Sequence, residues 1–181
     1  MKKAAIPRSA WARIRLFAMD VDGILTDGTV SVSSDATETK RYSIIDGLGL
    51  LLVREQGIQL AWISGRRSEA TSLRAAELKI PHLIQGRHDK LEALSSLAAG
   101  LGIALRDCAY MGDDFIDAPA IAAAGIGISV PTALPAAIAS ADYVTRRQAG
   151  YGAVREVCDL LLASRVKRPG NPKASRRTKA L

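Results

Sequence analysis

Residues 17–30 read FAMDVDGILTDGTV, and this stretch decides how the rest of the sequence is interpreted. A short apolar run ends on Asp20, and Asp22 and Asp27 follow within eight positions, among two glycines. Carboxylates this close together repel one another, so a positive group nearby has to compensate for them. A metal ion is the obvious candidate, and its other ligands are expected elsewhere in the chain.

On the C-terminal side of this stretch, short apolar runs alternate with segments of helical periodicity. That alternation predicts an α/β fold with a three-layer, Rossmann-like parallel sheet. Strands are expected over residues 14–20, 58–64, 82–86, 108–114, 126–130 and 142–145, and helices over residues 46–57, 68–80, 89–102, 117–125, 134–141 and 152–165. Residues 29–34 and 37–44 predict a β-hairpin inserted after the first strand. The roughly 25 residues between Asp22 and the next helix are too few for a cap domain.

The charge of the chain is unevenly distributed. The formal net charge is +7, yet all 18 acidic residues lie within residues 16–164. Residues 1–15 and 165–181 are basic and contain no acid. We therefore expect one folded domain over residues 16–164, a basic N-terminal segment and a basic, disordered tail. Non-specific binding of polyanions by the tail is the alternative, and no specific nucleic acid is expected.

Composition argues against several other classes of protein. No apolar run reaches the ~20 residues that span a bilayer, so no membrane contact is expected. The N-terminal residues MKKAAIPRSA have lysines but no apolar run typical of a secretion signal. Cys108 and Cys158 are the only cysteines. This count argues against a disulfide scaffold and favours a reducing, cytoplasmic location.

Polar side chains follow several of the expected strands at their carboxyl ends. These are Asp20 and Asp22 after the first strand, Ser64 after the next, and Asp113 and Asp114 after a later one, with Lys90 at the start of a helix. Ligands of open α/β sheets bind beyond the carboxyl ends of the strands, where the strand order switches. We expect these groups, from four distant stretches, to converge on one site.

Four motifs resemble, in order, those of the haloacid dehalogenase superfamily of phosphohydrolases: DVDGILTDG at 20–28, ISGRR at 63–67, QGRHDK at 85–90 and YMGDDFID at 110–117. The resemblance extends over residues 16–160 and implies a phosphatase domain over residues 16–164. It also implies a phosphomonoesterase that forms an aspartyl-phosphate, which splits one difficult step into two easier ones.

The resemblance implies a role for each motif. Asp20 corresponds to the nucleophile, and Asp22 would protonate the leaving alcohol and then activate water. Gly23 would let the backbone turn and bring its amides near the phosphate. Ser64 and Lys90 would contact the phosphoryl oxygens. Alone, each would be interpreted as a helix cap or a surface lysine, and His82 and His88 are expected to be structural or solvated.

Mg²⁺ is the expected cofactor, since a hard cation prefers oxygen ligands and takes one or two carboxylates besides phosphate and water. Asp20, the backbone carbonyl of Asp22 and Asp113 fit that requirement, and Asp114 could ligate through water. Asp117 is expected to orient this shell. The alternative for Asp117 is capping of the following helix, where acids are favoured anyway.

The sequence around the motifs is more specific. KRYSIIDGLGL at 40–50 and YVTRRQAGYGAVREVCDLLL at 143–162 resemble 3-deoxy-D-manno-octulosonate 8-phosphate phosphatases. These are capless, Mg²⁺-dependent homotetramers in the pathway to lipopolysaccharide. The resemblance implies that residues 29–43 build the centre of a homotetramer and that residues 149–153 reach toward a neighbour's site.

Residues expected to bind the substrate are Gly23, Lys40, Gly65, Arg66, Arg87 and Tyr151. Two positions depart from the family: Ile45 stands where a basic residue is common, and Tyr151 where an arginine is typical. A guanidinium holds a sugar-acid carboxylate well, and Arg66, Arg67 or Arg87 could replace it, although each also fits a solvated helix face. Two alternatives stay open: a phosphatase of a nine-carbon ulosonate 9-phosphate, and a non-catalytic tetramerisation or binding module.

Overall fold

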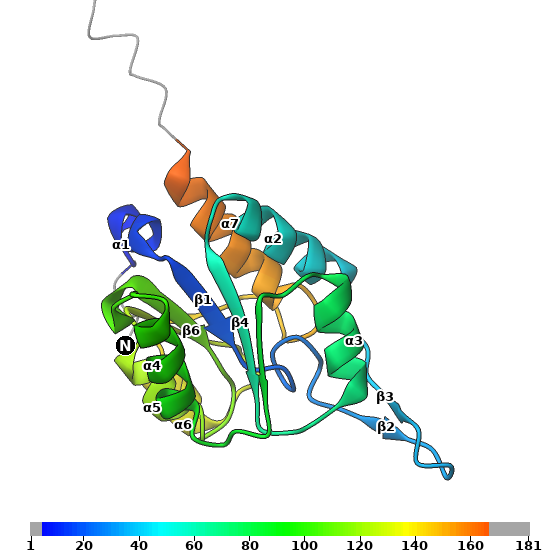
Figure 1. Cartoon of the computed structure of the whole chain (residues 1–181). Coiled ribbons are helices and arrows are strands. Elements are labelled where there is room, and N and C mark those ends of the chain that lie inside the picture. The colour runs from blue at the N-terminus through cyan, green and yellow to red at the C-terminus, as the bar shows by residue number, and fades with distance from the viewer. Residues whose placement is uncertain (1–4, 167–181) are drawn as a thin grey trace, which may run out of the picture.

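The computed structural model describes residues 5–166, so most of the expected basic tail, residues 167–181, lies outside the described part. Six parallel strands form one sheet, with helices on both faces (Figure 1). The strands are β1 Leu16–Met19, β4 Gln59–Ser64, β5 His82–Gln85, β6 Cys108–Met111, β7 Ile126–Ser129 and β8 Tyr143–Val144. The expected three-layer, Rossmann-like α/β fold is confirmed.

The helices divide into two groups, one on each face of the sheet (Figure 1). One face carries α1 Arg8–Arg13, α2 Ile44–Glu55, α3 Glu69–Glu77 and α7 Ala153–Arg165, and the other carries α4 Lys90–Gly100, α5 Ala118–Ala123 and α6 Pro135–Ser140. A short 3₁₀ turn, Leu105–Asp107, precedes β6. Each face has its own buried cluster of apolar side chains. The strands are therefore buried on both sides, which explains their continuous apolar runs.

The strand order β5-β4-β1-β6-β7-β8 places β1 in the middle of the sheet. After β1 the chain adds β4 and β5 on one side, and it then crosses to add β6, β7 and β8 on the other. The order reverses between β1 and β6, and this is where open α/β sheets bind ligands. Asp20 directly follows β1, and its backbone N–H donates to the Met111 carbonyl at the end of β6.

The predicted hairpin is present but short. Its strands are β2 Ser31–Val32 and β3 Glu38–Thr39, which pair only with each other. It projects away from the main sheet (Figure 1), and most of its side chains are exposed. Of the longer expected strands, only the pairs Ser31–Thr39 and Val32–Glu38 form a ladder, and in the described residues neither strand pairs with the central sheet.

Two helices differ from the sequence-based expectation. Helix α2 begins at Ile44, two residues early, because Ser43 caps it by accepting a hydrogen bond from the Asp46 N–H. Helix α1 was not anticipated, since the basic N-terminal segment has no clear period. It buries Trp11 edge-to-face against Tyr143, with ring centroids 5.8 Å apart.

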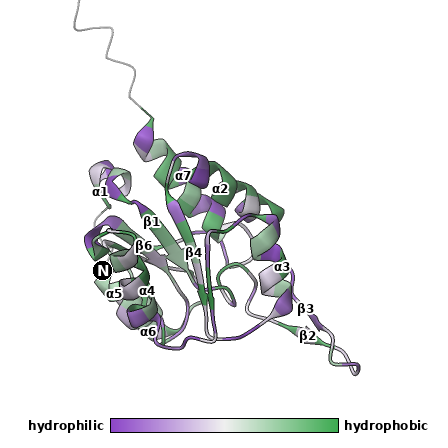
Figure 2. Ribbon diagram, viewed as in Figure 1, coloured by the Kyte–Doolittle hydropathy of each residue, from purple (hydrophilic) through white to green (hydrophobic). Residues whose placement is uncertain are grey.

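Hydropathy follows this layering (Figure 2): the strands of the sheet are mostly green, and purple gathers on outward-facing parts of the helices. Helix α2 is an exception, because it is green over much of its length (Figure 2). Ile44, Ile45 and Leu48 of this helix are exposed. Within residues 5–166, no helix is long and apolar enough to cross a membrane.

Candidate active site

A cavity of about 160 Å³ lies beyond the carboxyl ends of β1, β4 and β6. It is lined by Asp20, Asp22, Ser64, Gly65, Arg66, His88, Asp113, Asp114 and Ile116. Seven of these residues belong to the set expected from sequence. The topology therefore brings together groups that are up to 94 positions apart in the chain, at the point where the strand order reverses.

Asp20 is almost completely buried, and its carboxylate meets one buried cation. Lys90 donates from Nζ to Asp20 Oδ1 at 2.7 Å and to the Ile63 carbonyl at 2.5 Å. Burial, and then the negative charge of Asp117, raise the pKa of Asp20 to about 7, although Lys90 opposes this rise. The Ile63 carbonyl thus holds the Lys90 ammonium beside Asp20, the group expected to be the nucleophile.

Gly23 lies against Asp113 and requires a conformation that other residues avoid. Its φ is +85°, and a Cβ atom at this position would lie 2.1 Å from Asp113 Oδ2. Both facts explain why the turn after β1 contains glycine. The turn packs the first motif directly on the carboxylate that follows β6.

The carboxylates at the centre of the cavity fit a divalent cation. Ligand atoms of Asp20, Asp113 and Asp117 all lie within 4.8 Å of one another. Asp113 Oδ1 is buried and has no hydrogen-bond partner among the described residues. Burial, together with the charges of Asp20, Asp117 and Asp114, raises the pKa of Asp113 to about 8. A bound cation would supply the missing partner and relieve the repulsion.

Both carboxylate oxygens of Asp117 accept hydrogen bonds from other residues. Tyr110 donates its hydroxyl to Oδ1 at 2.7 Å, and the N–H groups of Asp113 and Asp114 donate to Oδ2. Asp117 makes no side-chain capping bond to α5. Asp117 therefore binds the loop that precedes α5, and Asp20 and Asp113 are the carboxylates left open to a cation. That Asp117 orients a metal shell stays a prediction.

Asp22 points toward a second buried lysine. Lys40 Nζ lies 2.6 Å from Asp22 Oδ1 and 2.9 Å from Oδ2. The Lys40 side chain is 0% exposed, whereas that of Asp22 is 25% exposed. Lys40 was expected to bind the substrate, yet its ammonium lies behind Asp22 and does not line the cavity.

Ser64, Gly65, Arg66 and His88 complete the rim of the cavity. Ser64 Oγ accepts a hydrogen bond from the Arg66 N–H, and the Arg66 guanidinium pairs with Glu38 at 2.7 Å. The His88 ring packs on Gly65, where an added Cβ would lie 3.0 Å from ring atoms. The sequence did not lead us to expect His88 among the lining residues. Its position two residues before Lys90 was the one indication that it lies near the site.

Two residues expected to bind the substrate have other partners in this chain. Arg87 forms two hydrogen bonds with Asp89, both at 2.6 Å. Tyr151 is 55% exposed and accepts a hydrogen bond from Arg41, which also pairs with Asp27 at 2.8 Å. Neither Arg87 nor Tyr151 lines the cavity within one chain. Arg41 was not anticipated, because its two partners come from distant loops.

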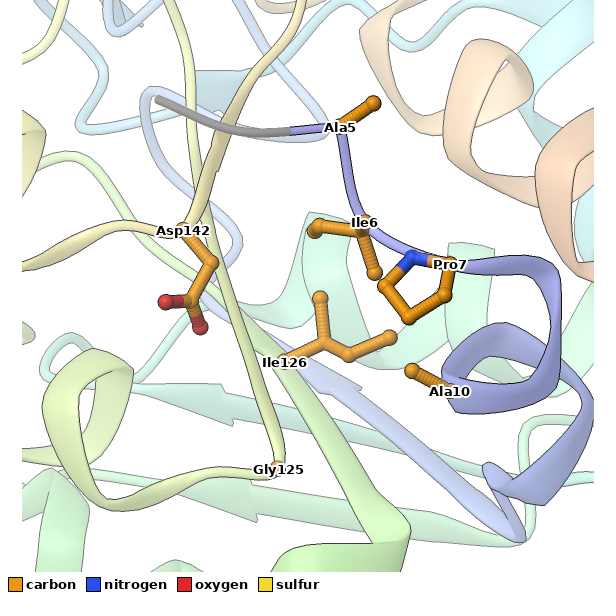
Figure 3. Close-up of a pocket in the computed structure, with 7 residues that line it drawn as sticks. All are labelled: Ala5, Ile6, Pro7, Ala10, Gly125, Ile126 and Asp142. Carbon is orange, nitrogen blue, oxygen red and sulfur yellow. The ribbon is translucent and has the colours of Figure 1, made fainter.

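A larger cavity of about 470 Å³ lies at the opposite end of the sheet, where Gly125 precedes β7 (Figure 3). Figure 3 shows the side chains of Ile6, Pro7 and Ile126 on one side of it and Asp142 across from them. Among the described residues that line it, Asp142 is the only charged one, and its carboxylate already accepts from the Gly127 N–H. Within residues 5–166 this cavity has no converging polar groups, so the smaller cavity is the candidate active site.

Comparison with known sequences gives a consistent result. The profile of the haloacid dehalogenase-like hydrolases matches residues 70–157. A curated relative, the 3-deoxy-D-manno-octulosonate 8-phosphate phosphatase of Escherichia coli K12, is 44% identical over 154 residues. The aligned region makes up 85% of this chain and 82% of that relative.

Solved structures agree over a similar span. The 3-deoxy-D-manno-octulosonate 8-phosphate phosphatase of Moraxella catarrhalis, in complex with magnesium, phosphate and KDO, has a TM-score of 0.85 and 50% identity, covering 87% of this chain and 90% of that one. A cobalt-bound structure of the Haemophilus influenzae enzyme has a TM-score of 0.82 and 34% identity, covering 86% and 91%. The likeness therefore extends over most of this chain.

Proposed function

This chain belongs to the haloacid dehalogenase-like hydrolases and, among them, to the 3-deoxy-D-manno-octulosonate 8-phosphate phosphatases, and we propose that it hydrolyses that sugar phosphate. The products are the free eight-carbon sugar acid and inorganic phosphate, in the synthesis of lipopolysaccharide precursors. The phosphatase domain in this proposal spans residues 16–164. The nine-carbon substrate and the non-catalytic module are not favoured, since the relatives are named for the eight-carbon reaction.

One observation carries the proposal: Asp20 follows the central strand, beside the Lys90 ammonium and the partnerless Asp113 oxygen. A phosphate monoester is an anion, and a carboxylate can attack it only where nearby positive charge offsets the repulsion. Lys90 supplies one such charge. The carboxylates of Asp20 and Asp113 can hold a second.

In the first step, an oxygen of Asp20 attacks phosphorus, and the bond between phosphorus and the sugar oxygen breaks. Asp22 gives a proton to that leaving oxygen, which departs as an alcohol. Ser64 donates a hydrogen bond to a phosphoryl oxygen, and Lys90 balances its charge. Asp20 is left as an aspartyl-phosphate.

In the second step, water attacks the phosphorus atom, and the bond between phosphorus and Asp20 breaks. Asp22 now takes a proton from the attacking water and so returns to its starting state. Its partial exposure supports this role, since the same carboxylate has to meet first the leaving alcohol and then the water. Inorganic phosphate is released.

Mg²⁺ would be held by Asp20, Asp113 and the backbone carbonyl of Asp22, with Asp114 through water. When bound, it supplies positive charge against the phosphoryl oxygens and the clustered carboxylates. The buried Asp113 oxygen without a partner and the raised pKa values of Asp20 and Asp113 support this ligand set.

Residues at the mouth of the cavity bind the sugar acid in this proposal. Arg66 lines the cavity and is the nearest guanidinium to it. Gly65 lines the cavity and brings its backbone N–H close to the phosphate. Gly23 contributes the turn, because its own N–H donates to Thr26 Oγ1. Arg87 and Tyr151 would act from a neighbouring subunit or after exchanging their present partners, Asp89 and Arg41.

A homotetramer is part of the proposal. The hairpin projects from the domain with Val30 and Val32 exposed, and the exposed apolar side of α2 adds further surface. Patches of this kind are typical of subunit contacts. Sedimentation of the purified chain should give four times the monomer mass, and a monomer at all concentrations would contradict it.

A cytoplasmic location also belongs to the proposal. Cys108 and Cys158 are both free and buried, and the pKa of each thiol is raised by burial. Two unpaired thiols fit a reducing compartment.

The decisive experiment measures phosphate release from eight-carbon and nine-carbon ulosonate phosphates and hexose phosphates, with Mg²⁺ or with a chelator. We expect Mg²⁺-dependent turnover that favours the eight-carbon acid. Asp20→Asn should abolish turnover and keep the far-ultraviolet circular dichroism, because only the nucleophile is lost. Asp35→Asn, in the exposed hairpin, is the matched control and should keep wild-type rates. Normal turnover by Asp20→Asn would overturn the assignment of the nucleophile.

A further inference from the structure

Lys40 is a fully buried lysine whose ammonium is held by groups from three segments. Besides both oxygens of Asp22, it contacts the Thr71 hydroxyl at 3.3 Å and lies 3.9 Å from Glu38 Oε1. Lysine is almost never buried without a charged partner. Here Asp22 is the nearest partner, so the position of each side chain depends on the other.

The surroundings of Lys40 fix it in place. Thr71, in α3, is buried, and its hydroxyl also meets the Tyr42 hydroxyl at 3.0 Å. The Tyr42 ring stacks on buried Trp62, with an interplanar angle of 9°. Glu38 is itself bound by Ser68 and Arg66. The ammonium is therefore supported by the core and by α3, and the Lys40 side chain is less free to change rotamer than that of a surface lysine.

We propose that Lys40 is a positioning residue for Asp22, fixing the carboxylate that transfers both protons, and that it does not bind the substrate. The inference rests on the proposed phosphatase function. Asp22 lines the cavity whereas Lys40 does not, and the Lys40 side chain is 0% exposed, so no sugar or phosphoryl oxygen reaches its ammonium. Two contacts from one ammonium hold both oxygens of Asp22 and restrict rotation of the carboxylate.

Besides its proposed place in the subunit contacts, the hairpin positions Lys40. Lys40 directly follows β3, so the returning strand of the hairpin places the ammonium against the Asp22 carboxylate. Displacement of a catalytic carboxylate by about 1 Å can lower the reaction rate ~100-fold. Loss of Lys40 should therefore slow the proton transfers of Asp22 and leave phosphate binding and nucleophilic attack intact.

The test compares wild type and Lys40→Met with two substrates: the sugar phosphate and 4-nitrophenyl phosphate, whose leaving group needs no proton at neutral pH. With the sugar phosphate, kcat should fall about 100-fold while KM stays within about threefold. With 4-nitrophenyl phosphate, rapid mixing should give a burst of one nitrophenolate per site, followed by slow turnover. The burst reports normal attack by Asp20, and the slow phase reports impaired activation of water.

A double-mutant cycle separates positioning from a general structural effect. If Lys40 acts through Asp22, adding Lys40→Met to Asp22→Asn should lower the residual kcat by less than about threefold. Tyr42→Phe is the matched control, since it keeps the ring on Trp62 and removes none of the three partners of Lys40. If Lys40→Met does not fold, Thr71→Val removes the hydroxyl that supports the Lys40 ammonium beside Asp22. It should give the same normal burst and a smaller decrease in the turnover that follows.

Three results would overturn the proposal. A raised KM with unchanged kcat would make Lys40 a substrate ligand. Loss of the burst would mean that it acts on Asp20 or the phosphoryl group. A full, additive effect in the Asp22→Asn background would mean that it supports the fold only. Failure of the wild type to hydrolyse either substrate would instead contradict the proposed function itself.

Discussion

Gly23 sets how closely the loop after β1 can approach the loop after β6. An added methyl group would lie 2.1 Å from Asp113 Oδ2, on a backbone with φ of +85°. Asp113 would have to leave the position in which it faces Asp20. The geometry of the carboxylates therefore depends on the absence of one side chain.

Gly23→Ala should reduce kcat by about 100-fold and weaken Mg²⁺ binding, because Asp113 is displaced by about an ångström or more. Steady-state kinetics and calorimetric titration with Mg²⁺ measure both effects. Gly57→Ala is the matched control: its φ is +78°, but nothing lies within 4 Å of an added Cβ. It should destabilise the fold by about 1 kcal/mol through backbone strain and leave kcat unchanged. Equal activity of both variants would contradict the importance of the contact.

The raised pKa values of Asp20, about 7, and Asp113, about 8, predict how metal binding depends on pH. A carboxyl group whose pKa is raised in the metal-free fold keeps its proton below that pKa, and this proton has to leave when a cation binds. The affinity for Mg²⁺ should therefore rise as the pH increases from 6 to 8.5. Calorimetry in two buffers with different heats of ionisation should detect proton release near pH 6.5. A pH-independent affinity without proton release would contradict this prediction.

At the scale of elements, one carboxylate joins the starts of two helices. Asp46, in the first turn of α2, is 1% exposed and accepts from the N–H groups of Gly152 and Arg155 at the start of α7. Both bonds give an acceptor to backbone N–H groups that have no partner within the helix at its N-terminus. The loop that carries Tyr151 is thus held by a residue about 100 positions earlier in the chain.

Asp46→Ala should lower the free energy of unfolding by ~2 kcal/mol, because two N–H groups lose their acceptor in a buried place. Chemical denaturation measures the change. Asp159→Ala, which removes an exposed acid of α7 that pairs with Arg155, is the control and should change the free energy of unfolding by less than about 0.5 kcal/mol. If the two variants were equally stable, Asp46 would not be the cap that joins α2 and α7.

Sequence patterning predicted the elements whose signals are local. The strands that flank the site are mostly apolar runs, and Asp20, Ser64 and Asp113 lie at or just beyond their carboxyl ends, so their convergence could be inferred from topology. Lys40 and Asp22 were each named from sequence, but their contact depends on the path by which the hairpin returns. No local pattern encodes that path, and the roles proposed for the site residues stay predictions.

At the scale of the whole molecule, α1 closes the end of the sheet that lies opposite the candidate site. Trp11 packs on Tyr143 and is 5% exposed, and Arg165 at the end of α7 donates to the Trp11 carbonyl. The two ends of the described chain are thereby joined. Sequence reasoning treated this part only as basic, because the partners of Trp11 lie more than 130 positions away.

Trp11→Ala should destabilise the protein by ~3–5 kcal/mol, because it leaves a large void under α1. Its kcat at low temperature should match wild type, since the site lies at the other end of the strands. Thermal unfolding and kinetics measure the two effects. Arg13→Ala, on the exposed side of α1, removes only the pair with Asp107 and should cost about 1 kcal/mol or less. A large loss of kcat in folded Trp11→Ala would contradict this separation.

The central position of β1 has a consequence for how the enzyme is made. β1 leaves the ribosome first among the strands, but its two neighbours, β4 and β6, are synthesised about 40 and 90 residues later. Asp20 therefore exists early in synthesis, whereas Lys90 and Asp113 reach it only when most of the chain has emerged. A nascent chain cannot assemble the cation site before β6 pairs with β1, so the growing polypeptide should remain metal-free until the sheet is nearly complete.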